Sequence, residues 1–222
     1  MKKTIILVAL FIFPISVYII FASAAHNFRY LPVLTKNVAP INNFESLRGD
    51  TVQFKKFITV LCIYGDDIHD MRGNAFNLND QIYKNYAHLK EFQFVVLAEK
   101  GTRDKAQKLI DDLHDFTGLN MNQWKVVFAS PQQIQHVFNS MKTDVTLNDK
   151  KATSYAFIVD REGNLRGRKK AENRNSKTLY GYNTQSIGLL HQIMTDDLDV
   201  LFAEYRLKET KKERDILKYD DK

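Results

Sequence analysis

The clearest structural signal in the chain is an apolar run of eight residues, Phe57-Ile58-Thr59-Val60-Leu61-Cys62-Ile63-Tyr64. Apolar side chains occupy both alternating faces of this run, which is typical of a strand buried in the middle of a sheet. Gly65 and an acidic loop follow directly, so the strand should end there. The run therefore predicts a central strand whose sheet is flanked by helices.

Strands and helices alternate after this run. We expect further strands at residues 92–97, 125–129 and 155–159, a hairpin strand from Leu165, and helices over about 71–90 and 102–118, from Ser130 and from about Asn183. The segment Ser130-Pro131-Gln132-Gln133 has the residues of a capping box. This alternation predicts βαβ units in a mainly parallel sheet, closed by an antiparallel hairpin. The predicted fold class is α/β, with the element order of a thioredoxin-like fold.

The first 25 residues differ from the rest of the chain. Lys2 and Lys3 precede an uncharged run from Thr4 to Ala25, which as a helix would span about 33 Å, close to the thickness of a bilayer core. We therefore expect one N-terminal transmembrane helix that contacts the lipid bilayer through residues 4–25, with the lysines on the cytoplasmic side. A cleaved signal peptide is the alternative, because Ala22-Ser23-Ala24 fits a cleavage site. Either segment predicts that the following domain is exported.

The sequence divides into four parts on this basis. Residues 1–25 form the transmembrane anchor or signal segment, 26–50 a tether, 51–205 the thioredoxin-like domain, and 206–222 a charged tail. The tail alternates in sign, which is typical of a solvated helix extension or a disordered end.

Composition excludes several classes of protein. The 222 residues are 44% apolar and 12% aromatic, which excludes a disordered chain. One cysteine excludes an intramolecular disulfide, a Cys-x-x-Cys pair and a thiolate-rich zinc or iron–sulfur site. The net charge of +6 is too small to indicate nucleic-acid binding. An exported domain would also not meet nucleic acid.

The chain resembles the Sco/SenC family in its anchor, in residues 27–34, in the strand at 58–64 and in Ile158-Val159-Asp160-Arg161-Glu162-Gly163. The last segment matches the family's strand and Asp-x-x-Gly turn. The resemblance implies a single-pass protein of the bacterial inner membrane whose thioredoxin-like domain faces the periplasm. Members of this family deliver copper to, or reduce thiols at, the copper site of cytochrome oxidase.

The activity motif of that family is missing. Its Cys-x-x-x-Cys pair would follow the first central strand, where this chain has Gly65-Asp66-Asp67-Ile68-His69-Asp70-Met71. Asp66 and Asp70 fall at the two cysteine positions, to within one residue. The family's third ligand is a histidine before the fourth strand, where residues 151–155 contain none. Carboxylates are hard ligands that hold Cu(I) poorly.

These substitutions predict a non-catalytic protein without a cofactor. We expect a scaffold or assembly factor linked to respiratory-oxidase or copper-site biogenesis. Its protein partner is unidentified, and the resemblance suggests a respiratory oxidase subunit or another assembly factor.

Two alternatives start from individual residues. In a metal-binding chaperone, Asp66, His69 and Asp70 could hold a hard or borderline ion such as Cu(II) or Zn(II). Acidic residues at the start of a helix more often cap its amides and complement its dipole. In a thiol enzyme of peroxiredoxin type, Cys62 would be the nucleophile, but a position within a strand offers neither exposure nor a nearby cation.

Two further groups of residues are weaker candidates. The remaining histidines lie far apart in the sequence and are expected at the surface: His26, His88, His114, His136 and His191. The segment Arg161–Lys177 contains seven basic and two acidic residues, so it could dock an acidic partner or lipid headgroups. A solvated loop with lysines that protect a sheet edge is the simpler interpretation.

Overall fold

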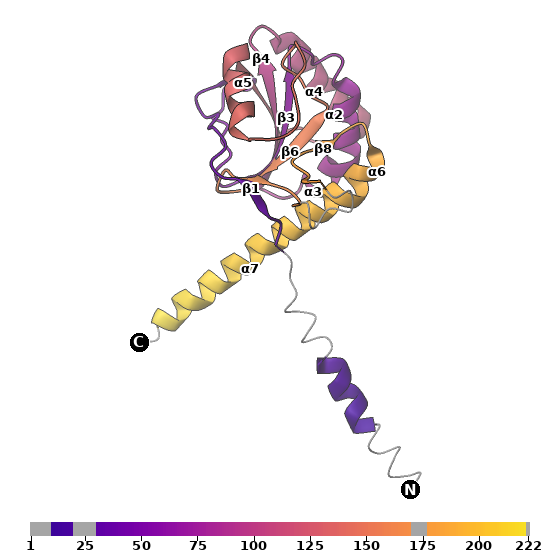
Figure 1. Ribbon diagram of the computed structural model, residues 1–222, viewed down its shortest axis with the longest axis vertical. Coiled ribbons are helices and arrows are strands. Elements are labelled where there is room, and N and C mark those ends of the chain that lie inside the picture. Colours follow the sequence, from indigo (N-terminus) through magenta and orange to yellow (C-terminus); the bar gives the residue numbers. More distant parts are fainter. Residues whose placement is uncertain (1–9, 20–29, 170–176, 221–222) are drawn as a thin grey trace. The chain divides into compact units, whose positions relative to one another are not determined.

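The computed structural model describes residues 10–19, 30–169 and 177–220 of the chain (Figure 1). The contacts divide it into two units between Tyr30 and Leu31. In the first unit, residues 10–19 are helical and carry exposed apolar side chains such as Phe11 and Phe13. Among the described helices, none combines the length and apolar character needed to cross a bilayer. The rest of the anchor predicted over residues 4–25 lies outside the described residues.

The second unit is built on one mixed sheet. Its strands are β1 (Val33–Thr35), β2 (Glu45–Ser46), β3 (Ile58–Gly65), β4 (Phe92–Glu99), β5 (Trp124–Ala129), β6 (Tyr155–Val159), β7 (Leu165–Arg166) and β8 (Tyr182–Asn183). They are ordered β1-β7-β6-β3-β4-β5-β2, with β8 beside β6. β3, β4 and β5 are parallel, and the other pairings are antiparallel. The sheet confirms the predicted combination of βαβ units with a closing hairpin, but among the described strands it is not mainly parallel, because the short strands β1, β2, β7 and β8 all pair antiparallel.

Helices connect and cover these strands. They are α2 (Arg72–Leu78), α3 (Lys84–Tyr86), α4 (Arg103–Thr117), α5 (Pro131–Ser140), α6 (Ile187–Leu189) and α7 (Thr195–Asp220), with π-helical turns η1 (Asn79–Tyr83) and η2 (Leu190–Met194). The η1 turn joins α2 to α3, and η2 joins α6 to α7. The helix predicted over about 71–90 is therefore present, with a wider turn at its centre.

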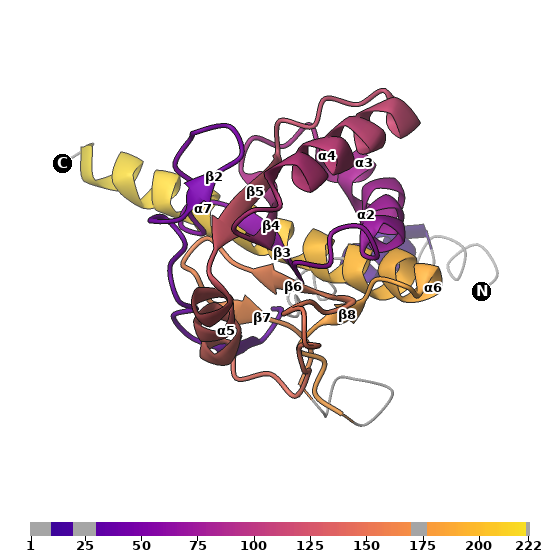
Figure 2. The same cartoon turned by 90° about the horizontal axis from the view of Figure 1, so that it is seen from above.

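Burial of β3 on both faces agrees with its sequence. Val60 and Cys62 belong to the core cluster formed with α2, α4 and α7, whereas Leu61 and Ile63 belong to the cluster formed with α5. Figure 2 shows α5 on one side of the strands and α2 and α4 on the other. Pairing with β4 on one edge and β6 on the other places β3 in the middle of the sheet.

Two helix ends follow their sequence signals closely. Ser130 Oγ accepts a hydrogen bond from Gln133 N at 3.3 Å, and Gln133 Oε1 accepts one from Ser130 N at 2.8 Å, which completes the predicted capping box of α5. Gly118 ends α4 at φ 66°, a left-handed conformation that glycine adopts readily. Thr102 stands at the N-cap of α4, a position where threonine often caps a helix, but its side chain makes no capping hydrogen bond. Its backbone has φ −97° and ψ 16° instead of the extended conformation typical of a cap, and its hydroxyl donates to Glu99 O at 2.8 Å.

The domain begins earlier than a tether over residues 26–50 would imply. Leu31, Val38 and Ile41 are buried, and β1 and β2 add to opposite edges of the sheet. Burial of an aliphatic side chain of this size is favourable by about 1.5–3 kcal/mol, which explains why the segment packs on the domain. At the other end, α7 continues as a helix through the segment predicted as a charged tail, as far as Asp220.

A buried ionic network attaches α7 to the sheet. Arg166 Nη1 donates to Asp160 Oδ2 at 3.0 Å, Arg166 Nε donates to Leu31 O at 2.9 Å, and Arg166 Nη2 pairs with Glu204 of α7. The three ionic side chains are each 5% exposed or less. A buried charge is tolerated only when it is paired in this way, so Arg166 fixes the contact between β7 and α7.

A second network lies two residues further along the chain. Arg168 Nε donates to Asp197 Oδ1 at 2.9 Å, and the Tyr182 hydroxyl donates to Asp197 Oδ2 at 2.6 Å. Desolvation raises the pKa of Asp197, and the two donors satisfy its carboxylate oxygens. This network joins the start of α7 to β8.

The basic segment Arg161–Lys177 thus has an internal use for three of its charges. Arg161 pairs with Glu209 of α7, and Arg166 and Arg168 pair as described above. Residues 170–176 lie outside the described residues. In the described part of the segment, Arg166 and Arg168 pair with buried carboxylates of the fold, which removes these two from the candidates for docking a partner, whereas the Arg161–Glu209 pair is partly exposed.

Truncation of Glu204 to alanine should lower the free energy of unfolding by about 3 kcal/mol, because it leaves Arg166 buried beside one carboxylate instead of two. Urea denaturation of the purified protein measures this change. Glu209→Ala is the matched control: its carboxylate is half exposed, so its removal should cost no more than about 0.5 kcal/mol. Equal losses in the two variants would contradict the buried network.

Candidate functional site

The loop after β3, residues 66–71, lies at the carboxyl ends of the parallel strands, where α/β sheets characteristically place their ligand sites. This loop rests against the segment that precedes β6. Asp66 N donates to Lys150 O at 3.0 Å, and Thr153 N donates to Ile63 O at 2.9 Å. Two segments far apart in the sequence therefore form one surface.

Gly65 is required at the point where the two segments meet. Its φ is +48°, and a Cβ atom there would lie 2.0 Å from Lys150 O and 2.6 Å from Lys151 O. A larger residue would therefore be strained and would push the two segments apart. The glycine that ends the central strand thus also permits this close approach.

Asp67 and Lys150 hold the two segments together through their side chains. Lys150 Nζ donates to Asp67 Oδ1 at 2.7 Å and to Asp70 Oδ2 at 3.2 Å, and Asn148 Nδ2 donates to Asp67 Oδ2 at 3.2 Å. The Asp67 side chain is 8% exposed, whereas that of Asp70 is 59% exposed. Hydrogen bonds to Asp67 and Asp70 raise the pKa of Lys150. The lysine therefore remains charged and satisfies the buried carboxylate.

The three candidate metal ligands of the loop have different surroundings. Asp66 pairs with Lys105 Nζ of α4 at 2.9 Å, Asp70 pairs with Lys150, and His69 lines a pocket beside α4. Within residues 10–19, 30–169 and 177–220, no group of three His, Cys, Asp or Glu side chains is placed to hold a metal ion. The structure thus gives the two carboxylates lysine partners and does not gather them with His69.

The acidic residues do not act as helix caps either. Met71 is the N-cap of α2 and makes no capping hydrogen bond through its side chain, and the first turn of α2 contains no acidic residue. The carboxylates contact lysines from other segments instead. The sequence did place charged residues in the right loop, but their partners come from α4 and from the segment before β6.

The environment of Cys62 is unsuited to thiol chemistry. Its side chain is buried within β3, and this burial raises the pKa of the thiol to about 12. Burial also raises the pKa of the neighbouring Tyr64. The Tyr64 hydroxyl is therefore neutral as well and provides no charge that would activate the sulfur. The thiol stays protonated at neutral pH.

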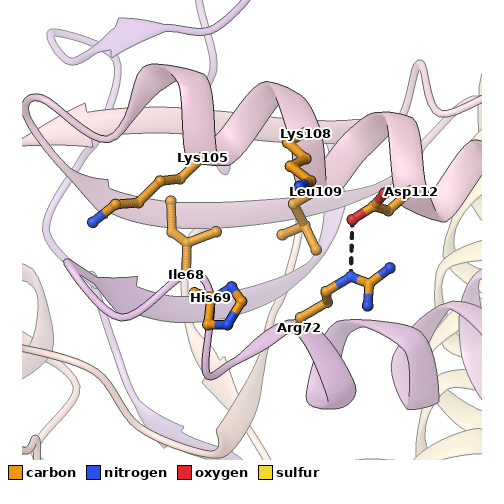
Figure 3. A pocket seen from close by; sticks show the side chains of 7 residues that line it. All are labelled: Ile68, His69, Arg72, Lys105, Lys108, Leu109 and Asp112. Atoms are coloured by element: carbon orange, nitrogen blue, oxygen red, sulfur yellow. Dashed lines mark hydrogen bonds and ion pairs between the residues drawn. The ribbon is translucent and has the colours of Figure 1, made fainter.

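A pocket of about 310 Å³ opens beside the loop, between α2 and α4 (Figure 3). Most of its lining residues are basic or aliphatic: Ile68, His69, Arg72, Lys105, Lys108, Leu109 and Asp112. Arg72 Nε donates to Asp112 Oδ2 at 2.8 Å across the gap between the helices. The pocket brings positive charge to the same edge of the sheet as the acidic loop.

Sequence reasoning missed the basic residues of this region. Arg72, Lys105 and Lys108 lie on two helices, and their charges did not form a run that the sequence would single out. Helical spacing on the segment 103–117 could have indicated that Lys105, Lys108 and Asp112 share one face. Lys150 directly precedes residues 151–155, which match the histidine segment of the Sco/SenC family. That match could have indicated that Lys150 lies near the loop after β3.

The comparisons with known proteins support the fold. Neither the protein-family models nor the curated proteins contain a match. A Sco/SenC-family lipoprotein from Bacillus anthracis is 10% identical, with a TM-score of 0.54 over 78% of this chain and 99% of that one. A proposed electron transfer protein from Aquifex aeolicus is 13% identical, with a TM-score of 0.50 over 76% of this chain and 92% of that one.

An Arabidopsis thaliana Sco protein with copper bound is 13% identical, with a TM-score of 0.45 over 72% of this chain and 97% of that one. Identities this low show the fold alone. The chain has a thioredoxin-like fold similar to that of the Sco/SenC-family lipoprotein, in agreement with the resemblance found in its sequence.

Asp67→Ala should lower the free energy of unfolding by about 2 kcal/mol, because it removes a buried carboxylate that satisfies two side-chain donors. Asp66→Ala makes the same change one position earlier, where the ion pair is half exposed, and should cost no more than about 0.5 kcal/mol. Urea denaturation compares the two variants. A loss at Asp67 no larger than that at Asp66 would show that the contact with Lys150 is dispensable.

The Cys62 thiol should be inert in the native protein. At pH 8 it is almost entirely protonated, since burial raises its pKa to about 12, and only the thiolate reacts rapidly. Labelling with an aromatic disulfide reagent should therefore be slow in buffer and complete in denaturing urea. Labelling in buffer at the rate of the unfolded chain would revive the thiol-enzyme alternative.

Proposed function

We propose that this chain is a membrane-anchored, exported thioredoxin-like protein without redox cysteines, which acts as a non-catalytic scaffold or assembly factor in respiratory-oxidase or copper-site biogenesis. The observation that carries the proposal is the ionic contact of Asp67 and Asp70 with Lys150. It occupies the loop in which the Sco/SenC family has its two cysteines. A lysine and two carboxylates offer neither a thiolate for Cu(I) nor a pair of thiols for disulfide exchange.

The chemistry of the remaining thiol supports a binding role. A single buried cysteine with a raised pKa cannot supply the second sulfur of a dithiol cycle. The surface formed by residues 66–71 and 148–153 is instead fixed by hydrogen bonds between its two segments. A rigid surface suits recognition of a partner, because little conformational freedom is lost on binding.

The uncharged run from Thr4 to Ala25, preceded by two lysines, supports membrane anchoring. The helix over residues 10–19 exposes the large apolar side chains expected of a segment that contacts lipid. We infer that the protein is held at the bacterial inner membrane with its thioredoxin-like domain in the periplasm. The oxidase setting rests on the resemblance of residues 27–34 and 158–163 to Sco/SenC proteins.

Deletion of the gene should lower the amount of assembled cytochrome oxidase, measured from the haem absorbance of membranes and from oxygen uptake with an artificial electron donor. Re-expression of the wild type and of Cys62→Ser should restore both readings equally, because the thiol has no part in the proposed role. Normal oxidase in the deletion strain would refute the oxidase setting. Rescue by the wild type without rescue by Cys62→Ser would refute the non-redox role.

The same strains test the location of the protein. Full-length protein should sediment with membranes, and alkaline phosphatase fused after Lys222 should be active, since that enzyme matures only outside the cytoplasm. A shorter, water-soluble periplasmic form would support the cleaved signal peptide instead of the anchor.

A further inference from the structure

The pocket between α2 and α4 has a mainly basic lining, in which Lys108 and two guanidinium nitrogens of Arg72 have no partner among the described residues. Arg72, Lys105 and Lys108 line it, against one acidic lining residue, Asp112 (Figure 3). Two aliphatic residues, Ile68 and Leu109, also line it, but they are almost fully buried, at 2% and 3% exposed. The ligand-accessible part of the pocket is therefore mainly its basic rim.

Two contacts hold the guanidinium of Arg72 in place. Its Nε donates to Asp112 Oδ2 at 2.8 Å, and its Cζ lies 4.8 Å from the centroid of the Phe76 ring. Phe76 packs edge-on against Phe116 of α4, with centroids 5.0 Å apart. In the described part of the chain, Nη1 and Nη2 of Arg72 donate to no acceptor. Those two nitrogens can bind a carboxylate through two parallel hydrogen bonds, and the existing contacts already hold the group in place.

The two lysines of α4 add charge that a ligand can reach. Lys108 is exposed and forms no ion pair with any described residue. Lys105 pairs with Asp66, but both side chains are half exposed, and an ion pair of this kind holds little energy that a ligand would have to overcome. Lys108 is thus available to a ligand in the pocket, and Lys105 adds positive charge at the end of the pocket beside Asp66.

We propose that this pocket binds a carboxylate side chain of an acidic segment of a partner polypeptide, through Arg72 and Lys108. The volume of about 310 Å³ is at the lower end of the range for small-molecule sites, so it suits one or two side chains. The net charge of +6 attracts an acidic partner as well. This inference rests on the proposed scaffold function and names the chemistry of its partner.

The test uses the full chain in detergent micelles and a fluorescent, end-blocked peptide of sequence Leu-Glu-Leu-Asp-Leu. Binding is followed by fluorescence anisotropy at low salt. The peptide should bind, and the isosteric Leu-Gln-Leu-Asn-Leu should not. Arg72→Met and Lys108→Met should each weaken binding about tenfold, because each removes a charge-assisted contact. Added salt should weaken it further.

Lys90→Met is the matched control. It removes the same charge from an exposed lysine, which precedes β4 and so lies at the opposite end of the sheet from the loop after β3. It should leave the affinity unchanged. A loss equal to that of Lys108→Met would mean that only overall charge matters, and would overturn the pocket. Wild-type affinity in both Arg72→Met and Lys108→Met would overturn it too.

Three results separate this inference from others. Inorganic phosphate that displaces the peptide at equal concentration would overturn the polypeptide assignment and leave a site for simple anions. Peptide binding that needs Arg72 and Lys108, in a protein whose deletion leaves the oxidase intact, would refute the oxidase setting while supporting the pocket. Loss of oxidase in the deletion strain, together with unchanged binding in both variants, would refute the pocket alone.

Discussion

Burial of β3 on both faces is the constraint on which the rest of the domain depends. A strand that is buried on every side must have its backbone groups paired at both edges, because an unpaired buried amide is costly. β4 and β6 pair with the backbone groups at the two edges of β3. α5 covers one face of the strand, and α2 and α4 cover the other. The strand can therefore reach solvent only at its ends. Gly65 and the loop after it stand at one of these ends, so the position of the candidate site is a consequence of the core.

The elements that could be predicted are those whose causes are local. The continuous apolar run located β3. The residues Ser130, Pro131 and Gln133 located the capping box, and Gly118 located the end of α4. Thr102 shows the limit of such signals, since it stands at the N-cap of α4 without the extended backbone conformation or the side-chain bond of a cap. The π turn η1 has no marker in the sequence that we recognise. Local patterns thus gave the order of the elements and the fold class.

The site could be located but its contacts could not be predicted. The loop with Asp66, Asp67 and Asp70 was recognised from its place after the central strand, yet the partner of Asp67 is 83 residues away in the sequence. No periodicity connects Asp67 with Lys150, because only the folded sheet brings the two segments together. The same holds for Arg166, whose partner Glu204 lies 38 residues further along. The two interpretations of the acidic loop in the sequence, a metal site and a helix cap, both rely on residues within the loop or directly after it. The lysine partners come from other segments.

The two arginines that hold α7 also determine its axial register. Leu198, Leu201 and Phe202 pack α7 against the core, and the two ion pairs add contacts that depend on its position along the helix axis. Arg166 and Arg168 face Glu204 and Asp197, which are seven residues apart on α7 and so about 10 Å apart along its axis. A slip of one turn, about 5.4 Å, would separate both pairs at once. The two ion pairs therefore fix the position of α7 along its axis, in addition to its hydrophobic packing.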